Sequence, residues 1–332
     1  MKQNPLDREA DPGTIKKLYR KGVLDARARD RALEILNPPA RWWLWSERML
    51  LFLGSALSLA GIIFFFAYNW NEIGHFTKFG MIELAMIASV YGAWKKGLDR
   101  TSGKMLATAA SVLVGVLLAV YGQAYQTGAD AYELFAGWAA LMLGFAAVTN
   151  LGGLWFLWLV VLNVAVTLFF FQIWEPVHGT DERVLFVILA VLNGAGLVVR
   201  EWAYQLGADW LKSRWTRSIV LTAVMVLSSI LVVEMIVEPE DISGIHGMAS
   251  LLWAGFMAVG YLYFKNGARD LSSVAIVLVT LFGVVGTFIG KIIPFDEWPR
   301  GWALLMGLII LALAGVVVFW LRVLDGEKEV TP

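Results

Sequence analysis

Long apolar segments alternate with short polar segments along the chain from about residue 49 onward. Ten segments of roughly 16–23 mostly apolar residues can be drawn, close to the length that crosses ~30 Å of hydrocarbon as a helix. Their approximate bounds are 49–68, 76–94, 105–122, 134–149, 153–173, 184–199, 218–236, 247–264, 271–293 and 302–321. The pattern predicts an all-α polytopic membrane protein with about ten transmembrane helices.

The N-terminal segment, residues 1–47, is polar instead. Thr14 and Asp25 are expected to cap two short helices, and Asn37–Pro39 to end the second before the membrane. We therefore expect a cytoplasmic basic helical hairpin that has too few apolar residues to fold alone. Its net positive charge places it near anionic headgroups. Nothing in it is typical of a nucleic-acid recognition helix, so no nucleic-acid partner is expected.

The remaining residues fall into three parts. Residues 48–150 form a four-span unit, residues 151–322 hold six further transmembrane helices, and residues 323–332 form a cytoplasmic tail. The turn at 150–153 contains two glycines and is so short that it predicts a tight antiparallel hairpin of the fourth and fifth spans.

Composition and charge narrow the class of protein. Hydrophobic residues make up 58% of the 332 residues and charged residues only 16%, which excludes ordinary soluble domains. Of the 27 Lys and Arg residues, 23 lie on the N-terminal side of the alternating spans and 4 on the other side. The positive-inside rule therefore places both termini in the cytoplasm. The chain has no cysteine, which excludes disulfides, thiolate metal sites and cysteine nucleophiles.

Catalytic and cofactor motifs are missing from the sequence. His75, His178 and His246 lie in or beside different outer loops, without the spacing of a zinc site. No P-loop, nucleophile elbow or dinucleotide fingerprint occurs. We therefore expect no metal and no cofactor, and we do not expect an enzyme.

A stripe of small residues follows one face of the third span. Ala107, Ser111, Gly115 and Ala119 recur every fourth residue, the pattern that lets two helices approach closely in lipid. Packing within the chain is the first interpretation, and a homodimer interface is the alternative.

Polar and aromatic residues gather where the first and third spans reach the outer side. Amides beside aromatic rings suit a polar, hydroxyl-rich ligand or a lipid headgroup, because amides hydrogen-bond while rings cover apolar faces. The alternative is a solvated loop held at the interface by its tyrosines. The residues concerned are Asn69, Trp70, Gln123, Tyr125, Gln126 and Asp130.

Glu83 places a carboxyl group inside the second span, about 10 Å below its outer start at 1.5 Å per residue. Such a group costs several kcal/mol unless it is paired, protonated or in contact with water, so it marks a functional position. We expect Glu83, Gln123 and Gln126 to converge on one outward-opening cavity with Asn69 and Trp70 at its rim.

Other polar residues in the spans have simpler interpretations. Asn163 and Asn193 lie mid-span and are expected to hydrogen-bond between helices. Glu234 and Lys291 lie near outer span ends and are expected to reach outward to the interface.

Several short motifs occur in a fixed order. Leu18–Gly22 closes the first helix, Ala67–Trp70 ends the first span, Gly122–Gln126 leaves the third, and Trp138–Leu141 lies in the fourth. Over about residues 12–150 the chain resembles the bacterial membrane family catalogued as domain of unknown function 2157. The resemblance implies a multi-pass protein of the bacterial cytoplasmic (inner) membrane and no established activity.

Three functions fit these observations. The first is a protein that binds or transports a small polar molecule, a cation or a lipid headgroup at an outward-facing site between spans one to four. The second is a non-enzymatic membrane scaffold or sensor that acts through its N-terminal cytoplasmic segment. The third is a membrane enzyme that acts on lipid-linked substrates.

Overall fold

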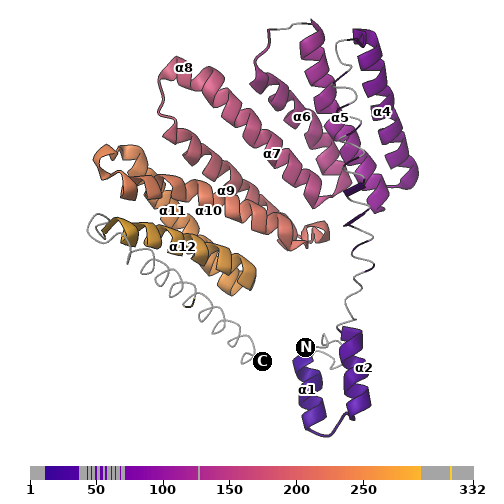
Figure 1. Cartoon of the computed structure of the whole chain (residues 1–332), viewed down its shortest axis with the longest axis vertical. Coiled ribbons are helices and arrows are strands. Elements are labelled where there is room, and N and C mark those ends of the chain that lie inside the picture. Colours follow the sequence, from indigo (N-terminus) through magenta and orange to yellow (C-terminus); the bar gives the residue numbers. More distant parts are fainter. Residues whose placement is uncertain are drawn as a thin grey trace. The chain divides into compact units, whose positions relative to one another are not determined.

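The computed structural model describes residues 12–36, 72–125 and 128–292, together with isolated positions between 43 and 68 and residue 315. That part of the chain is helical and contains no strand (Figure 1). The chain divides into two compact units, Met1–Gly74 and His75–Pro332, and each is described by itself. The prediction of an all-α polytopic membrane protein is confirmed.

The first unit contains a hairpin of two helices, α1 (Pro12–Arg20) and α2 (Ala26–Leu36). Asp25 caps α2 as predicted, because its Oδ1 accepts a hydrogen bond of 2.6 Å from the backbone N–H of Ala28. The prediction that Thr14 caps α1 is wrong. The helix begins two residues earlier, at Pro12, whose fixed φ suits a first helical position.

The second unit is a series of long helices. They correspond to the second to ninth predicted spans, whereas the first and tenth lie outside the described residues apart from isolated positions. Figure 1 shows α4 to α7 following one another as neighbours. The helices are α4 (His75–Lys96), α5 (Thr101–Tyr125), α6 (Ala131–Thr149), α7 (Gly152–Phe169), α9 (Arg183–Gln205), α10 (Arg214–Val237), α11 (Gly244–Leu262) and α12 (Leu271–Ile292).

Seven of the described helices are long and apolar enough to cross a membrane. The eighth long helix, α4, is not among the seven, and it carries Lys78 and Glu83 in its N-terminal half. Two spanning helices end in wider π-helical turns, where Phe170–Trp174 continues α7 and Tyr263–Gly267 continues α11. A short helix, α8 (Glu175–His178), follows the first of these turns.

The turn between α6 and α7 is as short as the sequence predicts. The helix α6 ends at Thr149 and α7 begins at Gly152. Asn150 takes the left-handed conformation, with φ 47°, which asparagine tolerates better than most residues. The Nζ of Lys104, at the start of α5, donates a hydrogen bond of 3.0 Å to the carbonyl oxygen of Asn150. The tight antiparallel hairpin is therefore confirmed.

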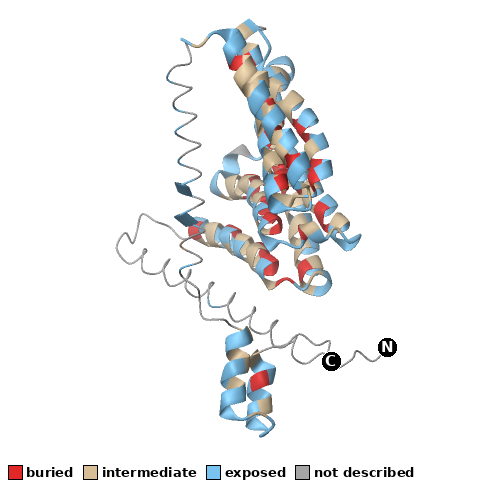
Figure 2. Ribbon diagram, turned by 90° about the vertical axis from the view of Figure 1, so that its right-hand side faces the viewer, coloured by how far each residue is buried: buried red, intermediate tan, exposed pale blue. Residues whose placement is uncertain are grey.

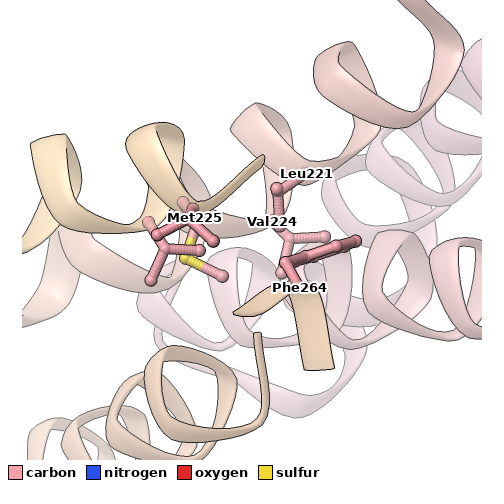
Figure 3. Close-up of a cluster of buried hydrophobic side chains, with 6 residues drawn as sticks. Leu221, Val224, Met225 and Phe264 are labelled. Atoms are coloured by element: carbon pink, nitrogen blue, oxygen red, sulfur yellow. The ribbon is translucent and has the colours of Figure 1, made fainter. Parts of the chain in front are cut away.

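Two apolar clusters hold the second unit together. In the first, α10 supplies Leu221, Val224 and Met225, which contact Phe264 and two valines of α12 (Figure 3). The second lies between α6 and α7 around Met142 and Leu154. In lipid such contacts stabilise helices mainly by close packing, since the surrounding acyl chains are equally apolar. The helix α10 contacts α9, α11 and α12, so it is central to the C-terminal half of the unit.

Candidate functional site

Several residues of the predicted outer site lie where α4 begins and α5 ends. Phe79 of α4 stacks on Tyr125 of α5 with ring centroids 6.1 Å apart, and Tyr125 lies 4.8 Å from Tyr121. Both tyrosines are more than half exposed. These three rings join the two helices and present aromatic surface outward.

Glu83 follows Phe79 by one helical turn on the same face of α4. Tyr121 precedes Tyr125 by one turn on α5, which runs antiparallel to α4 as its direct neighbour. Since Phe79 and Tyr125 stack, Glu83 and Tyr121 lie level with each other, one helical turn further from the start of α4 and the end of α5. The Glu83 side chain is exposed. A carboxylate and aromatic rings therefore border the same stretch of the α4–α5 surface.

The other predicted site residues are only partly placed. Gln123 is exposed on α5, and Asp130 is exposed directly before α6. Asp130 has the extended backbone of a cap residue, with φ −68° and ψ 151°, but its side chain makes no capping hydrogen bond. Asn69, Trp70 and Gln126 lie outside the described residues. The convergence of Glu83 with the two glutamines stays a prediction.

The small-residue stripe of α5 faces α6. Ser111 is fully buried and Gly115 lies against Trp138, so a Cβ atom added at Gly115 would come within 2.4 Å of the indole ring. The Nε1 of Trp138 donates a hydrogen bond of 2.9 Å to the backbone oxygen of Ser111. Ala107 is buried as well, and Ala119 is half-buried. The geometry favours packing within the chain over a homodimer interface for this stripe.

The same contact recurs one helix further along. Trp158 of α7 donates from its Nε1 to the backbone oxygen of Ala139 in α6, over 2.9 Å. A helix carbonyl oxygen that already accepts the backbone hydrogen bond of its own helix has a second lone pair, which can accept another hydrogen bond. Two tryptophans thus tie α5, α6 and α7 together. The sequence patterns did not predict this role of the two tryptophans.

The mid-span amides pair between helices as predicted. The Nδ2 of Asn193 in α9 donates to Oδ1 of Asn163 in α7 over 2.6 Å, and the reverse bond measures 3.3 Å. Each amide also donates to a backbone oxygen of its own helix. The prediction of an interhelical hydrogen bond is confirmed.

A buried network of four charged residues joins neighbouring ends of α9, α10 and α12. The asymmetry of Lys and Arg predicts that these helix ends lie on the cytoplasmic side. The sequence patterns did not predict the network. Arg217 of α10 donates to both carboxylate oxygens of Glu201 in α9, each over 2.8 Å, and to Asp270 before α12 over 3.1 Å. Arg200 pairs with the same Glu201 and donates to two backbone oxygens of the 211–213 loop. All four side chains are at most 9% exposed.

Neutral groups complete this ionic network. The hydroxyl of Tyr263 donates to Glu201 over 3.0 Å, and that of Ser273 donates to Asp270 over 2.9 Å. Arg214 lies 3.8 Å from the other oxygen of Asp270. Burial alone would raise the pKa of Asp270, but hydrogen bonds from Ser273 and Arg217, with the charges of both arginines, outweigh burial and lower that pKa. Each of the four buried charges has an opposite charge nearby, so the network connects the helices, and the Oδ1 of Asp270 is buried without a hydrogen bond.

A smaller cluster lies at the opposite end of α10. Arg183 donates from two nitrogens to one oxygen of Glu234, over 2.8 and 2.6 Å. His246 lies 3.7 Å from the other oxygen, and its Nδ1 accepts the backbone N–H of Ser243. Glu234 therefore pairs with a cation of α9, an ion pair that the sequence pattern did not predict. Lys291 donates to the backbone oxygen of Val237.

The comparisons with known proteins bear on the N-terminal part of the chain. Residues 16–155 match the family model described as "Predicted membrane protein (DUF2157)". The match confirms the resemblance seen in the motifs. The DUF2157 region reaches the start of α7, so it includes the α4–α5 surface and the α5–α6 stripe but not the ionic network. No curated protein and no solved structure matches the chain. The protein is a multi-pass membrane protein.

Proposed function

We propose that this membrane protein binds a small polar molecule, a cation or a lipid headgroup at the outer ends of α4 and α5, as a binding or transport protein. The proposal includes a location in the bacterial inner membrane with both termini in the cytoplasm. The observation that supports it best is the exposed Glu83 carboxylate, one turn below the stacked rings of Phe79 and Tyr125.

The physical argument rests on the cost of this carboxylate. An ionised group at that depth is stable only beside water, a proton or a cation. Aromatic faces carry a negative quadrupole that attracts cations, and a carboxylate adds a full charge. Tyr121 and Tyr125 offer such faces together with hydroxyl groups for hydrogen bonding. Among the three ligand classes, a cation or a cationic headgroup fits this chemistry best.

The experiment measures stabilisation of the purified protein by defined probes. Tetramethylammonium chloride and ethanolamine chloride would be compared with sodium chloride at equal ionic strength, with the Tm in detergent as readout. A ligand that binds only the folded state raises the Tm with concentration. We expect a cation-dependent rise in the wild type, its loss in Glu83→Gln, and its retention in Glu182→Gln, an exposed carboxylate outside the proposed site.

Two outcomes would contradict the proposal. One is that neither organic cation raises the Tm above the sodium chloride control. The other is that the rise persists unchanged in Glu83→Gln.

The second candidate function is a scaffold or sensor that acts through the N-terminal segment. Its support is that Met1–Gly74 forms a compact unit of its own, which contains the α1–α2 hairpin. Deleting residues 1–41 separates the candidates, because only the sensor function requires this segment. Cation-dependent stabilisation that survives the deletion would favour the outer binding site.

A further inference from the structure

The helix α1 of the hairpin carries a basic face. The helix α1 contains no acidic residue, and its one buried side chain is Ile15, which turns toward the inside of the hairpin. By helical periodicity, Lys16, Lys17 and Arg20 lie on the side away from Ile15. All three are exposed, as is Lys21 directly after the helix. Figure 2 shows the hairpin as mostly exposed surface.

The described hairpin contains three carboxylates, and two of them already interact with groups in or beside α2. Asp25 caps that helix through the N–H of Ala28, and Asp30 forms an ion pair of 2.6 Å with Arg29. Arg29 also lies over the ring of Tyr19, 4.5 Å from its centroid. Within the described residues, no carboxylate lies within ion-pair distance of Lys16, Lys17, Arg20 or Lys21. The basic face of α1 is therefore available for an external anion.

We propose that the basic face of α1 binds anionic lipid headgroups of the membrane in which the chain is embedded. The hairpin is joined to the predicted first span by a short segment of the chain, so it is held near the bilayer surface. Basic residues at that distance are attracted by the negative potential of anionic lipids, and each strengthens association about fivefold. Exposed Val23 and Ile35 add apolar groups that suit the headgroup boundary. This interaction is independent of the proposed outer site.

The test uses the full chain in nanodiscs, because the hairpin is too small to fold alone. The natural sequence has no cysteine, so Thr14→Cys gives a single labelling site on α1. A fluorophore there would be quenched by nitroxide groups on lipid headgroups when α1 contacts the bilayer. Discs of phosphatidylcholine alone would be compared with discs that contain one quarter phosphatidylglycerol.

We expect strong quenching only in the discs with phosphatidylglycerol, and its loss when salt is raised from 50 to 500 mM. Lys16→Gln with Arg20→Gln should lower the ratio of docked to free hairpin by about 25-fold, as two fivefold factors. The matched control, Arg27→Gln with Arg31→Gln, removes two exposed charges of α2 and should change this ratio far less.

Three results would overturn the proposal. Equal quenching in both kinds of disc would show that lipid charge is irrelevant. Equal loss in both double variants would show that net charge matters and the α1 face does not. The third result is that polyglutamate or RNA protects the fluorophore from quenching while phosphatidylglycerol has no effect. That result would assign the basic face to an acidic macromolecule.

Discussion

At the scale of single residues, the contact between α5 and α6 depends on the missing side chain of Gly115. The indole of Trp138 occupies the space that a Cβ atom would need, and its N–H reaches the backbone of Ser111. The four-residue spacing predicted a face for close approach, and the structure adds the aromatic ring that fills it. The tight fit makes this position sensitive to any added atom.

Gly115→Leu should therefore destabilise the protein. The new side chain would clash with the ring of Trp138, and overpacking of this kind costs about 1–3 kcal/mol. Thermal unfolding in detergent would measure the effect as a lower Tm. Gly144→Leu is the control, because Gly144 is an exposed helical glycine of α6 with open space around its Cβ position. Equal Tm values for the two variants would show that the α5–α6 contact is looser than described.

At the scale of helices, the ionic network explains how α9, α10 and α12 stay together at one end. The carboxylate of Glu201 accepts from two arginines, while Arg217 bridges it to Asp270, directly before α12. Buried pairs of this kind are weak net stabilisers, but removing one partner leaves an uncompensated buried charge. The network therefore makes the three helices dependent on one another.

Asp270→Asn should destabilise the protein at neutral pH by about 3 kcal/mol, since Arg217 loses a charged partner in a buried site. The folded pKa of Asp270 lies below its ordinary value, so the ionised form stabilises the fold above about pH 4. This contribution is lost as the pH falls through the folded pKa. The stability difference between wild type and variant should thus shrink from pH 7 to pH 3.

Unfolding in detergent across this pH range measures the difference. Asp99→Asn, at an exposed carboxylate between α4 and α5, is the control and should leave stability unchanged. A difference between wild type and Asp270→Asn that stays constant down to pH 3 would contradict the role assigned to the Asp270 charge.

At the scale of the whole molecule, the chain combines two units that follow different physical rules. The second unit is a series of apolar helices, seven of which can span a membrane. The first contains a hairpin with one buried side chain and a basic face. The DUF2157 match includes parts of both units, so it groups the hairpin with the helices that follow it.

The predicted topology can be tested at this scale. Reporters fused after Leu36 and after Pro332 should both report the cytoplasm, because 23 of the 27 basic residues lie on that predicted side. Paired fusions to alkaline phosphatase and to green fluorescent protein would measure the side of each position. An outer signal from either position would overturn the even number of spans.

The sequence by itself determined the class of protein, the approximate position of each long described helix and the tight turn after α6. Hydropathy and turn chemistry are local properties, because they depend only on the residues of a segment of about 20 residues and not on the helices that pack against it. Helix ends were less well determined, because α9 continues to Gln205 beyond the predicted end at 199. Arg200 therefore counted only as one of the basic residues of the predicted cytoplasmic side, and neither Arg200 nor Glu201 was predicted to be part of a network.

Only the tertiary structure decided which side chains meet. Arg217 and Asp270 lie 53 residues apart, and Ser111 and Trp138 lie 27 apart. Their pairing depends on the rotation and crossing of whole helices, which hydropathy does not encode. At the outer site the sequence selected Glu83 and Tyr125, while the structure added Phe79 and Tyr121 as their neighbours. The chain alone thus specifies which segments are apolar enough to enter the membrane, and packing specifies which of their side chains meet.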